Sequence, residues 1–229
     1  MPVLSITVSG PIMSILRVQS DKMKIFRIPY GPLSSNMYVI TIGADTFIVD
    51  PSVSFSRVPG IVEGFDLSSV RAVFATHCHH DHISCADEWR DKLPKVPFYM
   101  SSKDFPLLAD SLGNCSALID GEVLYENRFT AAEGTITIGQ TEITVIATPG
   151  HTKGSVCYLF NAGGESALFT GDTVFAGSVG RTDFKGGSYE ELSESVKTIK
   201  QLEKDLPIYP GHGPASTIAE EIKSNPYFA

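Results

Sequence analysis

The chain has 229 residues, a formal net charge of −8 and 42% hydrophobic residues. This length suits one large α/β domain better than two domains, and the apolar content is enough for a core without disulfides or other staples. The acidic balance, with no run of five or more Lys or Arg, argues against a nucleic-acid or membrane partner.

The first 22 residues are predicted to form an extension that precedes the folded domain. They are mildly apolar but lack a positively charged start and a clean small-residue cleavage site, so they fit a secretory signal poorly. Met23 opens the run MKIFRIPYG, which predicts the first strand. We therefore expect an extension at 1–22, one domain at 23–229, and a natural start at Met13 or Met23.

Beyond Met23, short β-rich runs alternate with turns that contain Gly, Pro and Asp, and no internal repeat or linker stands out. This alternation indicates a layered domain of the α/β or α+β class. The further predicted strands are 37–42, 46–49, 72–75, 135–138, 142–147, 155–160, 167–170 and 207–209.

One helix is clearly marked late in the chain. Ser188 is its predicted N-cap, and Glu191 is the reciprocal partner of a capping box. Residues at helical spacing predict a stripe that packs on a sheet. That stripe consists of Tyr189, Leu192, Val196, Ile199 and Leu206. Three other helices are expected at 83–93, 102–112 and 217–224.

The cysteines are scattered, and none forms a CxxC pair. Such spacing gives no disulfide framework, so we expect free thiols in a reducing compartment and hence a cytoplasmic location. The four positions are Cys78, Cys85, Cys115 and Cys157. Nothing in the sequence defines the oligomeric state.

Polar side chains of the metal-ligand type follow five of the predicted strands. Four of the six histidines lie in the run 76–82, and the others are His151 and His212. Asp50 and Asp172 also follow strands directly. If these strand ends converge on one sheet edge, their imidazoles and carboxylates meet in one cleft. Such ligands suit zinc, iron and manganese.

The spacing within the first cluster assigns its members to two sides. His77 and His79 are two residues apart, so they project to the same side of an extended segment and can bind one ion. Asp81 and His82 lie where the chain turns into a helix, and they can face a second ion. One ion needs three or four protein ligands, so the larger available set fits two ions that share a carboxylate. That set is His77, His79, Asp81, His82, His151, Asp172 and His212.

The motif His-x-His-x-Asp-His at 77–82, with His151, Asp172 and His212 downstream, resembles the signature of the metallo-β-lactamase superfamily. The resemblance covers the chain from Met23 nearly to its end. It implies a four-layer αβ/βα sandwich, in which two mixed sheets face each other under outer helices. It also implies two divalent transition-metal ions at one sheet edge, with zinc expected ahead of iron or manganese.

The resemblance also implies a role for each ligand. The first ion would be held by His77, His79 and His151. The second would be held by Asp81, His82 and His212. Asp172 would bridge the two ions, and Asp50 would orient the ligand loop through hydrogen bonds. Asp81 would in addition act in catalysis by orienting the attacking hydroxide.

Within that superfamily, the chain is similar to short bacterial glyoxalase II-like (hydroxyacylglutathione hydrolase-like) hydrolases. Asp172 stands where many β-lactamases carry a cysteine ligand, and residues 175–184 resemble the Gly-Arg-x-Asp stretch of those hydrolases. This implies a small-molecule substrate, a thioester such as S-D-lactoylglutathione. Full-length glyoxalase II adds a C-terminal helical domain that binds glutathione, whereas 17 residues follow His212 here.

Two other functions stay open. Mononuclear iron persulfide dioxygenases share the Gly-Arg-Thr-Asp-Phe run found at 180–184. A non-catalytic metal-binding module is the third reading, although all seven ligand positions are present. Arg181 and Lys153 could contact substrate or form ordinary surface ion pairs. Cys78 and His80, at the alternate positions of the motif, are expected to face away from the metals.

Overall fold

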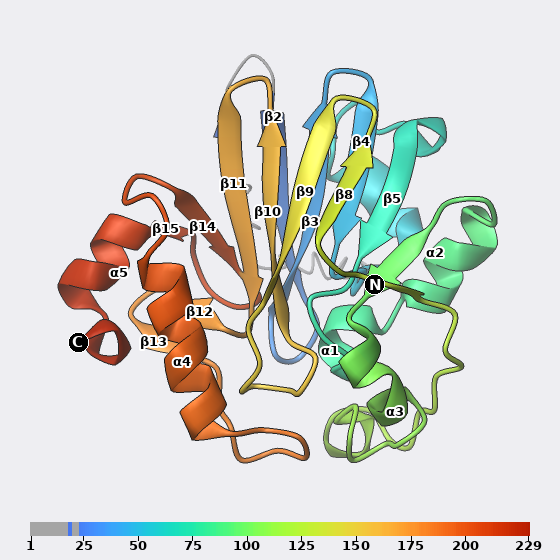
Figure 1. Ribbon diagram of the computed structural model, residues 1–229. Coiled ribbons are helices and arrows are strands. Elements are labelled where there is room, and N and C mark those ends of the chain that lie inside the picture. The colour runs from blue at the N-terminus through green and yellow to red at the C-terminus, as the bar shows by residue number, and fades with distance from the viewer. Residues whose placement is uncertain (1–17, 20–22) are drawn as a thin grey trace, which may run out of the picture.

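The computed structural model describes residues 18–19 and 23–229, so most of the predicted extension 1–22 lies outside the described residues. Two large sheets lie face to face, and helices cover the outer side of each (Figure 1). No helix among the described residues is both long enough and apolar enough to span a bilayer.

The first sheet has seven strands in sequence order. They are β1 (Val18–Gln19), β2 (Met23–Tyr30), β3 (Ser35–Ile42), β4 (Asp45–Val49), β5 (Val70–Phe74), β6 (Phe98–Met100) and β7 (Thr130–Ala131). Strands β1 to β4 pair antiparallel, whereas β4 to β7 pair in parallel. The sheet is therefore mixed, and the carboxyl ends of β4 and β5 lie at the same edge.

The second sheet has six strands in the order β15-β14-β11-β10-β9-β8. They are β8 (Thr135–Ile138), β9 (Thr141–Ala147), β10 (Val156–Ala162), β11 (Glu165–Gly171), β14 (Pro207–Pro210) and β15 (Ser216–Thr217). β10 runs antiparallel to both β9 and β11, and β11 runs parallel to β14. Strands β9, β11 and β14 therefore end at one edge. A separate hairpin joins β12 (Val174–Phe175) to β13 (Ser178–Val179).

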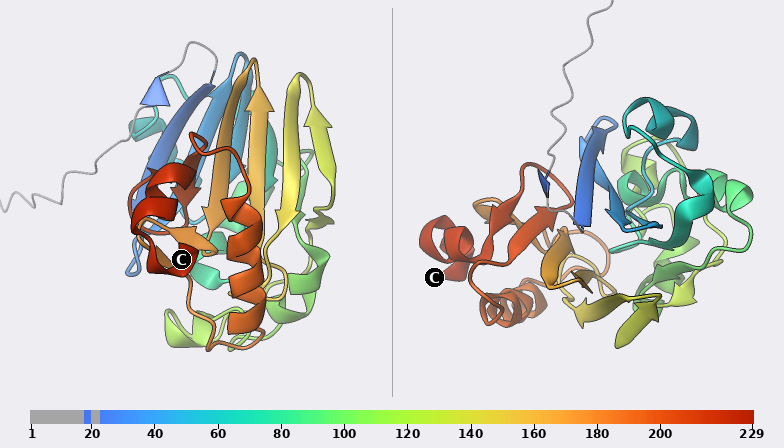
Figure 2. Two further views of the ribbon diagram at one scale, coloured as in Figure 1. Left: turned by 60° about the vertical axis from the view of Figure 1, so that its left-hand side comes forward. Right: turned by 90° about the horizontal axis from the view of Figure 1, so that it is seen from above.

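The helices form the two outer layers, as the views in Figures 1 and 2 show. One side carries α4 (Tyr189–Lys200) and α5 (Ile218–Ser224), and the other carries α1 (His80–Ile83), α2 (Ala86–Lys92) and α3 (Phe105–Leu108). Short 3₁₀ turns complete the chain at Phe55–Gly60, Leu67–Ser69, Ser102–Asp104, Ser116–Leu118 and Pro226–Phe228.

Three apolar cores separate these four layers. Strand β3 contributes to two of them. Met37 and Val39 pack in the core that also contains Trp89 of α2, whereas Tyr38 and Ile40 pack in the core between the sheets. The third core lies between the second sheet and α4 and α5. Alternate side chains of a strand point to opposite faces, so each sheet is buried on both sides. The αβ/βα four-layer sandwich implied by the sequence is confirmed.

Several predicted elements differ from the structure. The predicted helix 83–93 is split, since α1 ends at Ile83 and α2 begins at Ala86. The predicted helix 102–112 stops at Leu108, because the Leu108 carbonyl accepts hydrogen bonds from the Asn114 side chain and the Tyr125 amide. Strands β6 and β7 have no counterpart among the predicted strands.

The capping box predicted for α4 forms only in part. The Ser188 hydroxyl accepts the Glu191 backbone N–H at 3.3 Å, as expected. The reciprocal bond is absent, because the Ser188 N–H donates instead to the carbonyl of Gly150. The helix ends at Lys200, so Leu206 contributes to the same core from the following loop.

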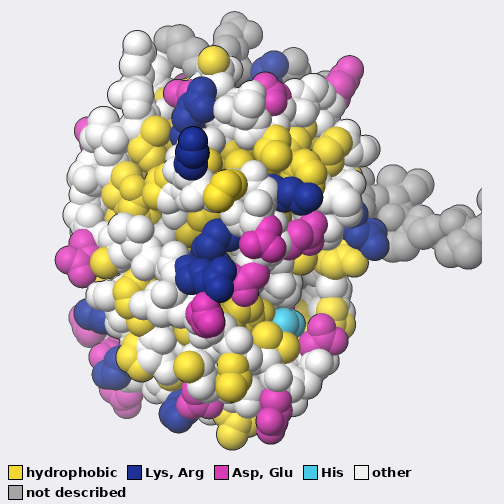
Figure 3. Space-filling model, turned by 90° about the vertical axis from the view of Figure 1, so that its right-hand side faces the viewer, with side chains coloured by type: hydrophobic (Ala, Val, Ile, Leu, Met, Phe, Trp, Pro, Cys, Tyr) yellow, Lys and Arg dark blue, Asp and Glu magenta, His cyan; other side chains and the backbone are white. Residues whose placement is uncertain are grey.

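Charged side chains of both signs are interleaved on the face shown in Figure 3, where only a small area of histidine reaches the surface. Five of the six histidines are buried, and His212 is half-buried. Imidazole is a polar group that costs free energy to bury unless it finds partners, so the buried histidines require an explanation.

Candidate metal centre

The seven predicted ligands lie together at one edge of the sandwich. His77 and His79 follow β5, and Asp81 and His82 belong to the first turn of α1. The second sheet supplies the others: His151 follows β9, Asp172 follows β11 and His212 follows β14. The common direction of β9, β11 and β14 is what brings these last three side chains to one place.

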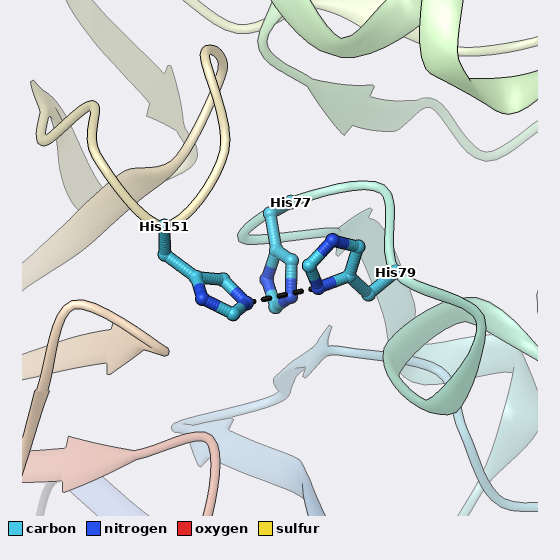
Figure 4. A group of neighbouring side chains, drawn as sticks. All are labelled: His77, His79 and His151. Carbon is cyan, nitrogen blue, oxygen red and sulfur yellow. Dashed lines mark hydrogen bonds between the residues drawn. The ribbon is translucent and has the colours of Figure 1, made fainter. Parts of the chain in front are cut away.

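The first group consists of His77, His79 and His151. One ring nitrogen from each lies within 4.8 Å of the others. Figure 4 shows that His77 and His79 come from one loop and that His151 approaches from another, with the three rings converging. Nε2 of His151 is 2.9 Å from Nδ1 of His79. Three imidazoles in this arrangement match the ligand set of a single transition-metal ion.

The second group consists of Asp81, His82 and His212, again with ligand atoms within 4.8 Å of one another. Asp172 lies between the two groups. Its Oδ1 is 3.3 Å from Nε2 of His82, and its Oδ2 is 3.4 Å from Nε2 of His151. A single carboxylate thus touches both groups, which is the position of a ligand shared by two ions.

The outer hydrogen bonds of the histidines fix which nitrogen faces the centre. Nδ1 of His151 is 2.7 Å from the carbonyl of Arg181, and Nδ1 of His212 is 3.0 Å from the carbonyl of Leu33. A carbonyl oxygen only accepts, so each Nδ1 donates a proton and each Nε2 points toward the ligand group. Nε2 of His82 and Nε2 of His212 are 3.3 Å apart.

Asp50 organises the loop from the opposite side. Its carboxylate accepts hydrogen bonds from the Thr76 N–H at 2.7 Å, the Thr76 hydroxyl at 2.9 Å and Nδ1 of His82 at 2.9 Å. The Thr76 hydroxyl proton is therefore used, so Nδ1 of His77 donates to the Thr76 oxygen at 3.0 Å. The backbone of Asp50 has φ 55°, a conformation that non-glycine residues rarely adopt. Asp50 thus orients two ligands, as the resemblance implied.

The buried ligand atoms fit a pair of cations. Nε2 of His77 and Oδ1 of Asp172 are buried without any hydrogen-bond partner among the described residues. Both atoms belong to the ligand groups, where lone pairs from several side chains meet. Lone pairs cannot satisfy one another, whereas a divalent ion accepts all of them. The residues therefore fit two divalent transition-metal ions.

The histidines differ in the direction in which their surroundings shift the pKa. Burial, together with the neighbouring imidazoles, holds the pKa of His77 well below its usual value and lowers that of His79 to about 3. Burial also acts to lower the pKa of His212, but hydrogen bonds to Asp172 and Asp81 outweigh it and raise the pKa to about 9. Burial opposes ionisation of Asp172, yet the adjacent imidazoles keep its pKa well below the usual range.

Asp104 is a buried carboxylate that sequence analysis did not single out. It accepts hydrogen bonds from the Cys78 N–H at 3.0 Å, the Thr152 hydroxyl at 2.8 Å and the Gly154 N–H at 2.7 Å. It therefore ties the loop that carries His77 and His79 to the loop that carries His151. An aspartate near the start of a predicted helix is ordinary in sequence, so no local signal marked it.

The remaining residues of interest lie outside the ligand groups. Cys78 is buried in an apolar core, and His80 contacts the Tyr125 hydroxyl at 2.6 Å, so neither joins the ligands, as expected. Arg181 forms an ion pair with Asp183, and Lys153 lies 3.4 Å from Glu191. These ion pairs match one of the two roles left open for Arg181 and Lys153.

A four-layer αβ/βα sandwich with a histidine and aspartate centre at one sheet edge defines a class of metal-dependent hydrolases. The model of the metallo-beta-lactamase superfamily matches residues 30–212. The chain belongs to that superfamily, as the ligand motif indicated.

Curated relatives carry names of the same kind. YqgX of Bacillus subtilis (strain 168), named a probable metallo-hydrolase, is 31% identical over 209 residues, which cover 90% of this chain and 97% of the relative. PksB of the same organism is named a probable polyketide biosynthesis zinc-dependent hydrolase. It is 31% identical over 206 residues, which cover 87% of this chain and 84% of PksB.

Solved structures share the fold over nearly the whole chain. The BLEG-1 B3 metallo-beta-lactamase superposes with a TM-score of 0.79 at 32% identity, covering 90% of this chain and 99% of that one. A di-iron-bound form of TTHA1623 gives 0.72 at 28% identity, with coverages of 88% and 99%. ETHE1 from Myxococcus xanthus gives 0.65 at 26% identity, with coverages of 88% and 83%. The names of these relatives and structures include both zinc and iron, so they do not select one metal.

Proposed function

We propose that the protein is a dinuclear metal-dependent hydrolase of thioesters, similar in activity to glyoxalase II. The observation that carries the proposal is the pair of ligand groups joined by Asp172. Its Oδ1 lies 3.3 Å from Nε2 of His82, and its Oδ2 lies 3.4 Å from Nε2 of His151 and 3.5 Å from Nε2 of His212. A single ion would use one group and leave the other, whose ligand atoms also lie within 4.8 Å of one another, without an ion. Two ions give every member of both groups a partner.

Each ligand then has a defined place. His77, His79 and His151 would hold one ion, and the other would be held by Asp81, His82 and His212, with Asp172 shared. We propose zinc, although iron and manganese accept the same donors. Two such cations supply a water that loses its proton near neutral pH and a Lewis acid for a carbonyl oxygen.

The chain's own groups orient this centre. Asp50 and the Arg181 carbonyl each hold an Nδ1–H, which keeps the ring planes of His82 and His151 fixed. Asp81 lines the cavity above the ligands and lies 3.3 Å from Nε2 of His212. We propose that Asp81 is the catalytic residue that orients the attacking oxygen, in addition to its role as a ligand.

The leaving group decides between substrate classes. Among the described residues that line the cavity, the carboxylates and imidazoles all belong to the ligand groups. Burial raises the pKa of the Cys115 thiol to about 11, so it is a poor proton donor. A thiolate leaves readily without protonation, whereas an amine or alkoxide does not. These observations favour a thioester.

The reaction balances without any further reactant. The oxygen of water bonds to the acyl carbon, the C–S bond breaks, and its electron pair stays on sulfur. The products are a carboxylate, a thiol and one proton released to solvent.

The test combines metal analysis with turnover. We expect about two ions per chain and release of free thiol from S-D-lactoylglutathione, measured with a thiol reagent. Asp172→Ala should reduce bound metal and lower kcat by at least about a hundredfold, because it removes a ligand to both ions. Asp91→Ala, at an exposed position of α2, is the matched control and should leave both measurements unchanged. A protein loaded with two ions that hydrolyses no thioester contradicts the proposal.

A mononuclear iron persulfide dioxygenase is the second candidate. The run 180–184 and the likeness to ETHE1 support it. The second ligand group counts against it, since one iron would leave Asp81, His82 and His212 without an ion. One iron per chain, with oxygen consumed on glutathione persulfide and no thioester turnover, would replace the first proposal by this one.

We also propose a small-molecule substrate and a cytoplasmic location. The four cysteines are free thiols, which supports a reducing compartment. Fractionation of the native cells, with detection of the protein by antibody, tests the location.

A further inference from the structure

The ligand groups form one wall of a cavity of about 840 Å³. Ligands from both groups line it, namely His79, Asp81, His151, Asp172 and His212. The other walls are mainly apolar, with Leu33, Leu118, Ile119, Phe175, Val179 and Phe184, and they also contain Cys115 and Arg181. A carbonyl placed at the ligands therefore has the rest of its molecule against these apolar side chains.

Apolar side chains flank the centre on both sides. The ring of Phe184 meets His79 edge-on, with the ring centroids 5.8 Å apart, and Phe175 meets His212 in the same way at 5.8 Å. One aromatic ring thus stands beside a ligand of each group. A substrate that reaches both ions passes between two apolar surfaces, where charged groups would lose their hydration without gaining a partner.

Two large apolar side chains stand exposed at the cavity walls. Leu118 is 60% exposed and Leu33 is 52% exposed. Single exposed leucines are common, but these two adjoin one cavity and continue its apolar lining outward. The apolar surface therefore extends well beyond the atoms next to the ligands, which suits a ligand with a chain of several carbons.

The apolar wall at Leu118 is held in place before any substrate arrives. The Asn114 side chain donates to the carbonyls of Leu108 and Val123 and accepts the Ser116 N–H, at 2.9–3.0 Å. The Ser116 hydroxyl adds a bond to Val123. The Leu33 carbonyl is likewise bonded to His212. Such anchored walls lose little conformational entropy when they bind a ligand.

The one charged lining residue outside the ligand groups, among those described, is already neutralised. Arg181 donates two hydrogen bonds to Asp183, at 2.5 and 2.6 Å, and its guanidinium lies 4.0 Å from the ring centre of Phe184. Three of the five N–H donors of Arg181 stay open, so a substrate carboxylate would share this cation with Asp183. The cavity therefore offers the carboxylates of glutathione a single cation that already pairs with another carboxylate.

We propose that the site selects thioesters with an apolar acyl group of several carbons, over those with small hydroxylated acyl groups such as lactoyl. This inference rests on the proposed thioester hydrolase function. Each methylene that leaves water against Leu118 and its neighbours should strengthen binding by up to about fourfold. A lactoyl group has one methyl and one hydroxyl, so it gains little from this surface.

The experiment varies the acyl group on a constant thiol. S-acetyl-, S-butyryl-, S-hexanoyl- and S-D-lactoylglutathione are compared with the metal-loaded full chain. We expect kcat/KM to rise at least tenfold from acetyl to hexanoyl, mainly through a lower KM, with lactoyl near acetyl. A series without such a rise, or a preference for lactoyl, overturns the inference while leaving the proposed function standing. Absence of turnover for all four thioesters contradicts the function itself.

A pair of leucine variants links any preference to the cavity wall. Leu118→Ser should reduce the hexanoyl-to-acetyl ratio of kcat/KM by at least threefold. Leu124→Ser is the matched control, because Leu124 is also exposed, at 65%, but does not line the cavity. It should keep the wild-type ratio. Equal ratios in wild type and Leu118→Ser would place the preference elsewhere and refute the assignment to this wall.

Discussion

Four of the five imidazoles in the candidate ligand groups are oriented through a second atom of their own ring. Asp50, Thr76 and two backbone carbonyls hold Nδ1 of four histidines, so Nε2 faces the ligand groups in each case. His79 differs, since its Nδ1 faces His151. Fixing the rings in advance lowers the entropy lost when ions bind, and it excludes the wrong tautomer.

Asp104 should matter to the centre although it is not a ligand. Asp104→Asn leaves a single acceptor oxygen for three donors, of which the Gly154 N–H or the Cys78 N–H would lose its partner. We expect the free energy of unfolding to fall by about 1–3 kcal/mol and metal occupancy to decrease. Thermal denaturation and elemental analysis measure the two effects. Asp91→Asn is the control, and equal behaviour of the two variants would show that Asp104 does not position the loops.

Metal binding should release protons in the neutral range. In the metal-free protein the pKa of His212 is raised to about 9, so this ring is protonated at pH 7.5 and must lose its proton to bind an ion. Apparent affinity for divalent ions should therefore rise with pH up to about 9 and level off above it. Calorimetry in two buffers with different ionisation enthalpies counts the protons. Identical binding enthalpies in both buffers at pH 7.5 would rule this out.

The raised pKa of His212 also makes the folding stability of the metal-free protein depend on pH. A histidine whose folded-state pKa is raised adds stability below its unfolded pKa of about 6.5, and that stability is lost as pH rises toward 9. His212 should therefore contribute less to the free energy of unfolding of the metal-free protein at pH 9 than at pH 6.5. The variant His212→Gln should weaken this dependence in denaturant titrations.

At the scale of elements, the loop after β9 packs against α4 through a glycine. Gly150 has φ +136°, and a Cβ at this position would lie 2.3 Å from the backbone nitrogen of Leu192. Its carbonyl accepts the Ser188 N–H at the start of the helix. The loop that presents His151 is therefore seated directly on the first turn of α4.

Substitution of this glycine should disturb both the helix and the centre. Gly150→Ala should lower the free energy of unfolding by about 2–4 kcal/mol, from overpacking and backbone strain together, and should reduce metal occupancy. Gly60→Ala is the control, since a Cβ there meets nothing within 4 Å, and it should change stability by less than about 0.5 kcal/mol. Chemical denaturation of both variants checks the difference. A stable Gly150→Ala with full metal content would contradict this account.

The sequence predicted the strands and the clustering of the seven candidate ligands better than it predicted the short helices. Strand ends that carry His151, Asp172 and His212 were visible because β-rich runs stop at Gly or Pro and a ligand residue follows. The break between α1 and α2 was not visible, since residues 83–93 have helical character throughout and the break depends on tertiary contacts. The Cys85 N–H, for example, donates to the carbonyl of Pro51.

The supporting residues of the site could not be predicted for the same reason. Asp104 and Thr152 are 48 positions apart, and Tyr125 meets His80 across 45 positions. Nothing in the local sequence of any of these residues records the contact. The clustering of the candidate ligands was predictable because histidines in a motif of fixed spacing carry their own signal.

At the scale of the molecule, the ligands join the two halves of the sandwich. His77, His79, Asp81 and His82 follow the first sheet, whereas the other ligands follow the second. Bound ions would therefore crosslink two sheets that otherwise meet through the apolar core between them. Any ion that binds only the folded chain adds to its stability in proportion to the logarithm of its concentration.

Removal of the ions should lower thermal stability as well as activity. At a free ion concentration of a hundred times Kd, each site adds about 2.7 kcal/mol, and about 2–4 °C of Tm is expected per kcal/mol for a domain of this size. Chelation should thus lower Tm by at least about 5 °C, and restored zinc should reverse the change. Asp172→Ala, which lacks the shared ligand, should show a smaller response to the chelator in the same calorimetric scan. If wild type and variant respond equally, the stabilising ions do not lie between the two ligand groups.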